Sequence, residues 1–249
     1  ERGSCFYCRQ CNRGCTVYAD FSSSSVLVKP AIETGNVDII PEAMAREVLT
    51  DNEGKATGVS FVSKTDMQEY SVGAKVVMLA ASACETARIL LNSKSSRYPH
   101  GLANSSRQVG RNMMDSTGAD IEASIPLLKG RPIYNEDGHT ANHLFIPWWG
   151  HAAQARGELD FARGYHFELD TGFRAPGSYY PAKLQGFGIA MKAQARRDYG
   201  AAVGLSLRGE MLPNDNCYLE IDEQVKDRWG IPVVKFHWKW SSQELNQVG

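Results

Sequence analysis

The chain has 249 residues and a formal net charge of −1, with 43% hydrophobic and 22% charged residues. These values are typical of a globular protein with an ordinary core, and the balanced charge does not indicate a nucleic-acid-binding surface. No run of eighteen apolar residues occurs and no signal-like segment opens the chain, so these residues predict neither a membrane span nor a secretory signal.

Four cysteines stand in the first fifteen residues with the spacing C-x2-C-x2-C-x3-C. They are Cys5, Cys8, Cys11 and Cys15. Bacterial ferredoxins use this spacing to wrap an iron-sulfur cluster, because one short loop can then direct several thiolates at one centre. The run therefore predicts a metal loop that serves electron transfer.

Two other interpretations of the cysteine loop remain open. Disulfides suit small secreted domains, whereas this chain is long enough for an ordinary core and its other cysteines, Cys84 and Cys217, are isolated. Structural zinc usually takes two ligand pairs separated by a longer loop, and no second pair follows at that distance. The proline that often follows the last ferredoxin cysteine is replaced by Thr16, which weakens the comparison with a ferredoxin domain.

Short strands are predicted after the cysteine loop, at residues 37–40, 43–50, 56–63 and 69–72, with turns at 52–54 and 66–68 between them. Residues 75–80 form a continuous apolar run, which is typical of a strand buried on both faces. The small residues that follow predict a turn and then a short helix that ends near Asn92. This strand, turn and helix resemble a unit of a doubly wound nucleotide-binding domain, although small residues also serve close helix-sheet packing.

Several short motifs, in their order and spacing, resemble one known family. They are Cys5-Phe-Tyr-Cys-Arg-Gln-Cys-Asn-Arg-Gly-Cys15, Gly35-Asn-Val, Met44-Ala-Arg-Glu-Val-Leu49, Val76-Val-Met-Leu-Ala-Ala-Ser-Ala83, Ala87-Arg-Ile-Leu-Leu91, Gly101-Leu-Ala-Asn-Ser-Ser106, Val109-Gly-Arg-Asn-Met-Met-Asp115, Leu212-Pro-Asn-Asp215, Asp227-Arg-Trp-Gly-Ile-Pro232 and Trp240-Ser241. The chain resembles the glucose-methanol-choline (GMC) flavin oxidoreductases, in particular the bacterial branch with a cysteine-rich loop, such as gluconate and glucose dehydrogenase large subunits.

The resemblance implies an α/β fold of two domains. Residues 1–116 would be part of an FAD-binding, doubly wound domain with the cysteine loop at its start. Residues 117–207 would form a substrate domain on a mostly antiparallel sheet, and residues 208–249 would open the family's C-terminal segment. Aromatic residues crowd the expected substrate domain and could stack on sugars, but the favoured explanation is sheet core and loop packing.

The resemblance also implies cofactor contacts. The strand around Ala45 resembles the one whose backbone hydrogen-bonds the adenine of FAD. The turn Ala81, Ser82 and Ala83 resembles the small-residue turn beside the ADP half, where the family more often has glycine at the position of Ser82. Asn112 lies in a loop that is near the flavin in the family, although it could equally cap a helix.

The implied reaction is oxidation of an alcohol or sugar hydroxyl by hydride transfer to FAD. The electrons would leave through the cluster toward a haem or quinone acceptor subunit. Cys5, Cys11 and Cys15 reproduce a three-cysteine pattern that holds a three-iron cluster in related dehydrogenases, and Cys8 would permit a four-iron cluster or be a spectator. No motif in the sequence identifies the substrate or the electron acceptor.

The expected G-x-G-x-x-G loop and the catalytic histidine segment are not in this sequence, so we assign no catalytic residue among its six histidines. We expect a piece of a longer protein that is inactive alone. The resemblance suggests the periplasm, although a cytoplasmic enzyme is also compatible. Two other functions remain: a non-catalytic electron-transfer module, and a degenerate family member stabilised by zinc.

Overall fold

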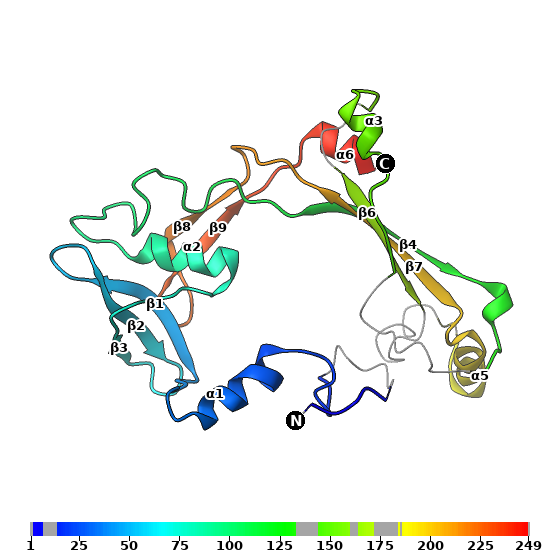
Figure 1. Ribbon diagram of the computed structural model, residues 1–249, viewed down its shortest axis with the longest axis horizontal. Coiled ribbons are helices and arrows are strands. Elements are labelled where there is room, and N and C mark those ends of the chain that lie inside the picture. Colours follow the sequence, from blue (N-terminus) through cyan, green and yellow to red (C-terminus); the bar gives the residue numbers. More distant parts are fainter. Residues whose placement is uncertain are drawn as a thin grey trace. The chain divides into compact units, whose positions relative to one another are not determined.

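A computed structural model describes residues 2–6, 14–132, 144–159, 164–171, 184 and 186–248. The chain divides into two compact units (Figure 1). One unit consists of Glu1–Asp38, Ser116–Met211 and Ser242–Gly249, and the other of Ile39–Asp115 and Leu212–Ser241. The unit that begins at Ile39 thus takes in the later strands of the chain, and the domain boundaries expected at 116/117 and 207/208 stay a prediction.

The unit that begins at Ile39 contains a three-stranded antiparallel sheet in the order β1-β2-β3. Its strands are β1 (Ala43–Thr50), β2 (Ala56–Ser63) and β3 (Glu69–Gly73). A tight turn joins β1 to β2, where Asp51 Oδ1 accepts a hydrogen bond from the Lys55 N–H at 2.8 Å and Gly54 adopts a φ of +86°. These three strands confirm the predicted ranges to within one residue.

Helix α2 (Ser82–Asn92) packs on β1, and its Ala87, Arg88 and Ile89 are buried. The contact is fixed by Ser93, whose hydroxyl accepts a hydrogen bond from the Val48 N–H at 2.9 Å and donates one to the Ile89 carbonyl at 2.6 Å. The same helix also contacts the antiparallel pair β8 (Tyr218–Lys226) and β9 (Pro232–His237) (Figure 1). The predicted helix is therefore confirmed, and it links two sheets of this unit.

The strand predicted at residues 75–80 does not form in the structure, and neither does the one predicted at 37–40. Val76 and Met78 are 78% and 86% exposed, whereas Val77 and Leu79 are half-buried. This alternation is a strand pattern, but a strand needs a neighbour to receive its backbone hydrogen bonds, and none of the described strands pairs with it. The prediction of a strand at residues 75–80 was therefore wrong, although residues 76–80 alternate between exposed and half-buried as they would in a strand.

The other unit contains a four-stranded antiparallel sheet in the order β4-β7-β6-β5 (Figure 1). The strands are β4 (Ser116–Ser124), β5 (Leu144–Ile146), β6 (Tyr165–Thr171) and β7 (Ala202–Glu210). β4 and β7 pair without a register shift from Ser116 opposite Glu210 to Ser124 opposite Ala202. This sheet confirms the mostly antiparallel architecture expected after residue 116.

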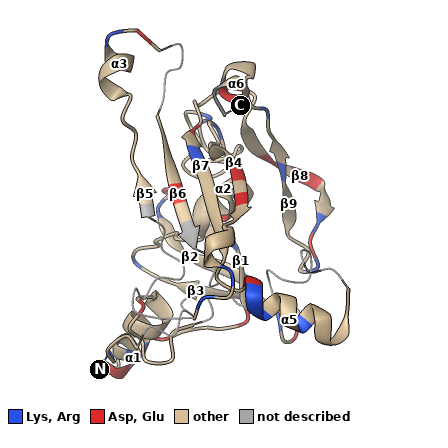
Figure 2. Ribbon diagram, turned by 90° about the vertical axis from the view of Figure 1, so that its right-hand side faces the viewer, with Lys and Arg blue, Asp and Glu red and all other residues tan. Residues whose placement is uncertain are grey.

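The described residues of this unit also form short helices. They are a π-helical turn (Ser23–Val28), α1 (Lys29–Glu33), a 3-10 turn (Pro126–Leu128), α3 (His151–Ala155), α5 (Gly188–Asp198) and α6 (Ser242–Val248). Arg196 and Arg197 stand in the last turn of α5 (Figure 2), where positive charge complements the helix dipole. The described residues thus form an α/β protein whose paired strands are all antiparallel, and none of their helices is long and apolar enough to span a bilayer.

Candidate functional site

The two flanks of the cysteine loop are tied together. The Gly3 N–H donates a hydrogen bond to the Val17 carbonyl at 2.7 Å. The Arg2 guanidinium donates from Nε to the Tyr18 carbonyl at 3.0 Å and from Nη2 to the Ala19 carbonyl at 2.6 Å. We call these three hydrogen bonds the Arg2 clasp. Because the clasp joins residues 2–3 to residues 17–19, it closes the loop that carries all four cysteines of the predicted metal site.

Cys15 lies among backbone donors. Hydrogen bonding from the backbone of Asp20, and further from Val17 and Ala19, outweighs desolvation and holds the pKa of the Cys15 thiol below its ordinary value. Amides directed at a sulfur favour the thiolate form, which is the form that binds metals and the form that ligates iron-sulfur clusters. The surroundings of Cys15 therefore fit a metal ligand.

The predicted metal ligands are only partly placed. Cys5 is exposed and Cys15 half-buried, while Cys8 and Cys11 lie outside the described residues. Within the described part of the chain no three histidine, cysteine or acidic side chains gather as a metal site, and Cys15, Cys84 and Cys217 form no disulfide. Cys217 is buried, and its sulfur accepts a hydrogen bond from the Lys239 N–H at 3.2 Å, so it has a structural role.

Ala45 lies on β1, which is an edge strand of its sheet. It stands opposite Phe61, and the register shifts between Ala45 and Glu47, so that Arg46 is an extra residue opposite β2. A bulge of this kind re-aims the strand locally, and the backbone groups on the outer side of an edge strand are not used by the sheet ladder. A flat aromatic ring that hydrogen-bonds the main chain fits this position.

The turn at Ala81, Ser82 and Ala83 leads into α2 and is exposed. Ser82 has a φ of +73°, in the left-handed region that favours glycine. The Ala81 N–H donates to Thr86 Oγ1 at 3.2 Å, and Ser82 Oγ accepts from the Glu85 N–H at 3.5 Å. Small side chains in an exposed turn before a helix leave the main chain open to a large ligand, and this fits the ADP half of FAD.

Asn112 is exposed, has a φ of +53°, and donates from Nδ2 to Gln108 Oε1 at 3.4 Å. The next element along the chain is the strand β4, so Asn112 caps no helix and that alternative was wrong. Ala45, the turn at 81–83 and Asn112 all belong to the unit that begins at Ile39. Their contact with a cofactor stays a prediction.

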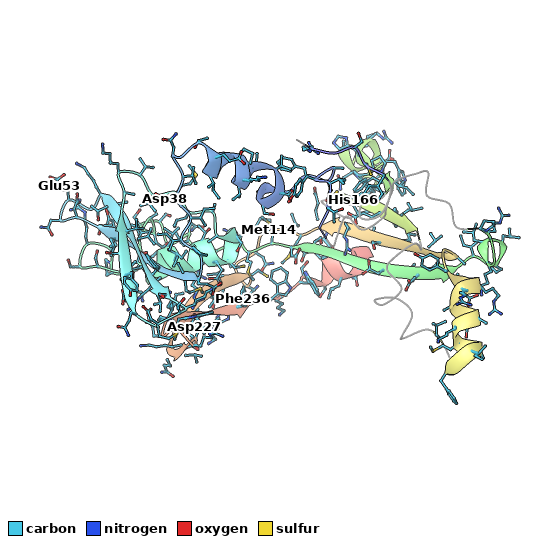
Figure 3. The ribbon with its side chains drawn as sticks, turned by 90° about the horizontal axis from the view of Figure 1, so that it is seen from below. Asp38, Glu53, Met114, His166, Asp227 and Phe236 are labelled. Carbon is cyan, nitrogen blue, oxygen red and sulfur yellow. The ribbon has the colours of Figure 1, made fainter. Side chains whose placement is uncertain are left out.

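Aromatic side chains gather around the connection between β5 and β6. Trp148 lies 4.6 Å from Tyr165 between ring centroids, and Trp149 stacks on Phe167 at 6.0 Å with 17° between the planes. On β6, His166 Nε2 lies 3.0 Å from Glu168 Oε1 (Figure 3). Trp149 is 63% exposed, whereas Tyr165 and Phe167 pack on one another. These rings thus contact one another, and the choice between packing and stacking on a sugar stays a prediction. Four further aromatic residues of the expected substrate domain, Tyr134, Phe173, Tyr179 and Tyr180, lie outside the described residues.

Sequence reasoning missed a cavity of about 220 Å³ at the C-terminal end of α2. Its charged lining residues are Lys94, Arg107, Arg111 and Glu220, with His100 beside them. Arg111 was part of a recognised motif and Arg107 lay just outside one, but nothing in their spacing indicated that they line a cavity. The opposite wall, which includes Leu219 and Ile221, comes from β8, far along the sequence.

Comparison with known proteins gives a consistent result. Residues 1–117 match the profile of the GMC oxidoreductases. The fructose dehydrogenase large subunit of Gluconobacter japonicus is 29% identical over 236 residues, which cover 93% of this chain and 40% of that protein. The 2-methyl-1,2-propanediol dehydrogenase of Mycolicibacterium austroafricanum is 27% identical over 213 residues, which cover 81% of this chain and 36% of that protein. The chain thus spans about two fifths of the length of these relatives.

Proposed function

We propose that this chain, whose first 117 residues match the profile of the GMC oxidoreductases, is part of an FAD-dependent dehydrogenase of that family that oxidises an alcohol or sugar hydroxyl. The observation that carries the proposal is the family match over residues 1–117, which contain both the cysteine loop and the turn before α2. Both relatives named above are dehydrogenases, one of fructose and one of a diol, and this supports a hydroxyl compound as the substrate class.

In this proposal FAD, when bound, supplies the ring that accepts a hydride from the substrate. The residues of this chain hold the nucleotide part of the cofactor. The main chain at Ala45 hydrogen-bonds the adenine, and the turn Ala81, Ser82 and Ala83 lets the backbone approach the ADP half. Asn112 helps to shape the loop near the flavin. The edge position of β1 and the exposed small residues before α2 support these roles.

We further propose that Cys5, Cys8, Cys11 and Cys15 hold an iron-sulfur cluster that carries electrons away from the flavin. The Arg2 clasp supports this proposal because it closes the loop, and the backbone donors around Cys15 support it because they favour the thiolate of that residue. The cluster would have three or four irons, according to whether Cys8 is a ligand. An acceptor subunit with haem, or a quinone, and a periplasmic location complete the proposal by family resemblance.

The test is the flavin, iron, acid-labile sulfide and zinc content of the anaerobically purified native protein. About one flavin and three or four irons per chain, with matching sulfide, are the expected result. Reduction of an artificial acceptor should then be tested with fructose and with 2-methyl-1,2-propanediol. Protein without flavin would refute the dehydrogenase proposal. Zinc alone in the loop would refute the electron path but leave the flavin chemistry standing.

A further inference from the structure

The cavity at the end of α2 is held by a loop, residues 99–113, that is fixed at both ends. Near its start, the Leu102 N–H donates to the Leu90 carbonyl at 2.9 Å, and a Cβ on Gly101 would lie 2.7 Å from that oxygen. Near its end, the Gly110 carbonyl accepts from the Leu219 N–H at 2.8 Å. Both glycines have a positive φ, +93° and +81°. The loop therefore lies against α2 on one side and β8 on the other.

Buried Asn104 organises the middle of the loop. Its Nδ2 donates to the His100 carbonyl at 2.8 Å, and its Oδ1 accepts from the Val109 N–H at 3.1 Å. The Arg107 N–H adds a hydrogen bond to the Asn104 carbonyl at 3.1 Å. This network fixes the backbone on which Arg107 stands. The hollow is thus a built feature and not a gap beside a loose segment.

Most charges around the cavity already have partners. Lys94 pairs with Glu223, and Glu220 accepts from His237 at 2.9 Å and lies 3.9 Å from Lys235. Figure 2 shows acidic and basic residues on β8 and β9, and Glu220 on β8 stands opposite Lys235 on β9. Since Glu220 is compensated on its own sheet, it opposes an anion in the cavity less than a lone carboxylate would.

Arg107 and Arg111 differ from Lys94 and Glu220 in their charge pairing. Within the described part of the chain no carboxylate lies within ion-pair distance of either guanidinium. Arg111 lies over the ring of Tyr218 at 4.2 Å, and that ring stacks on His237 at 4.1 Å, so the guanidinium is held in place by a cation-π contact. The two arginines, four residues apart, line the same cavity without a carboxylate to neutralise them.

The C-terminal end of a helix ordinarily repels anions. Here the last carbonyls of α2 are occupied: Ile89 accepts from Ser93, and Leu90 accepts from Ser93 and Leu102. Capping of these oxygens reduces the negative potential that they present to the cavity. The positive side chains therefore set the sign of the field in the hollow.

We propose that this cavity binds a phosphate group, with Arg107 and Arg111 as its principal ligands. Guanidinium groups match phosphate oxygens in paired hydrogen bonds. A volume of about 220 Å³ lies below the usual range of ligand pockets, about 300–1,000 Å³, so the ligand is small. Leu91, Pro99 and Ile221 provide apolar walls that suit the carbon frame of a phosphate monoester.

The site differs from the predicted FAD position. The turn at Ala81 to Ala83 precedes the first turn of α2, whereas the cavity lies at the last, and an 11-residue helix is about 16 Å long. The phosphate in this proposal is therefore not that of the dinucleotide at the turn. Binding can be measured whether or not the protein carries flavin.

Isothermal titration calorimetry of the purified protein tests the proposal with two probes, inorganic phosphate and glycerol 3-phosphate, at constant ionic strength set with sodium chloride. Arg107→Gln and Arg111→Gln should each weaken binding about 10- to 100-fold, which is the loss expected for a charged hydrogen bond. Arg107→Lys should lose less. Arg228→Gln is the matched control, because Arg228 packs on Trp229 at 4.7 Å, away from the cavity, and the affinity of this variant should not change.

Tighter binding of glycerol 3-phosphate would identify a phosphate monoester as the ligand, and equal or tighter binding of inorganic phosphate would identify the free ion. Either result supports the site when the arginine variants lose affinity. The proposal is overturned if neither probe binds with a Kd below the order of 10 mM, or if Arg228→Gln weakens binding as much as Arg107→Gln. Thermal unfolding by circular dichroism confirms that each variant is folded.

Discussion

Arg88 on α2 forms an ion pair with Asp227, at the start of the turn between β8 and β9, with 2.7 Å between Nη2 and Oδ2 (Figure 3). The two side chains are only 8% and 15% exposed. The guanidinium also donates to the carbonyls of Pro232 at 2.9 Å and Ile231 at 3.2 Å. Asp227 Oδ1 accepts from the N–H groups of Trp229 and Ile231. One buried charge pair thus ties the helix to a strand pair that is distant in sequence.

Removal of the cation should destabilise this unit strongly. We expect Arg88→Met to lower the free energy of unfolding by about 3–5 kcal/mol, since it leaves the Asp227 carboxylate buried without its partner. Lys55→Met is the control: Lys55 pairs with Glu53 at 2.8 Å, but both are about three-quarters exposed, and we expect a change within about 0.5 kcal/mol. Urea denaturation measures both. Equal effects of the two substitutions would contradict the role given to Arg88.

The same pair predicts how stability depends on pH. Burial raises the pKa of Asp227, but hydrogen bonds from Arg88 and from the backbone of Ile231 and Trp229 outweigh it, so the pKa lies below its ordinary value of 3.8. A carboxyl with a lowered folded-state pKa stabilises the fold above its unfolded-state pKa and loses that contribution in acid.

In urea titrations, the stability difference between the parent protein and Asp227→Asn should be largest at neutral pH. It should shrink as the pH falls below about 3.8, the ordinary value of the carboxyl. The amide that Asp227→Asn introduces does not titrate, so the difference between the two proteins isolates this group from the other carboxyls. A difference that stays constant from neutral pH to about pH 2.5 would show that Asp227 is not stabilised as an anion.

Gly101 is expected to be irreplaceable for steric reasons. A Cβ there would lie 2.7 Å from the Leu90 carbonyl oxygen and 2.8 Å from Leu91 Cα, both backbone atoms that cannot move aside cheaply. Gly230 also has a positive φ, +77°, but a Cβ on it would meet nothing within 4 Å. Gly230→Ala should therefore cost about 1 kcal/mol from backbone strain alone, and Gly101→Ala clearly more. Thermal unfolding compares them, and similar losses would rule out the close packing of the loop on α2.

The elements that could be predicted from the sequence are those fixed by local signals. The hairpin of β1 and β2 follows from β-branched residues on both sides of a turn at Asp51 and Gly54, and α2 follows from a small-residue turn before an apolar face. Residues 75–80 carry an equally clear strand pattern, but pairing is not local. Val76 and Met78 remain exposed because no described strand lies beside them.

The same distinction between local and non-local signals applies to the candidate sites. Cysteine spacing indicated a metal loop, but it could not indicate the Arg2 clasp, because a side chain that binds carbonyls leaves no pattern in the sequence. The cavity at the end of α2 could not be found either. Arg107 and Arg111 come from a loop, and Leu219 comes from a strand far along the chain, so only the fold brings them together.

The Arg2 clasp should matter for metal retention if the proposed cluster is present. Arg2→Gln removes two hydrogen bonds that hold the loop closed, and we expect less iron and sulfide per chain than in the parent after the same anaerobic purification. Arg131→Gln is a matched control, because Arg131 also donates from Nε to a carbonyl, that of Leu127 at 2.8 Å, outside the cysteine loop. Unchanged iron in Arg2→Gln would mean that the clasp does not support the cluster.

Ser82 should tolerate glycine better than any branched residue. Its φ of +73° strains a serine but not a glycine, while its hydroxyl contributes only a long contact of 3.5 Å with the Glu85 N–H. Ser82→Gly should therefore raise the free energy of unfolding by about 0.5–1 kcal/mol. Ala83→Gly, one residue further into α2, should lower it by a similar amount, because glycine weakens a helix.

Substitutions of Ser82 also test the proposed cofactor role of the turn. If the backbone at Ala81 to Ala83 approaches FAD, Ser82→Gly should leave the flavin content per chain unchanged or raise it. Ser82→Val should reduce both flavin content and stability, since a β-branched side chain is strained at positive φ and crowds the turn. Flavin absorbance and thermal unfolding give the two readouts separately. Loss of stability in Ser82→Val with full flavin content would leave the strain argument standing and remove the turn from the cofactor site.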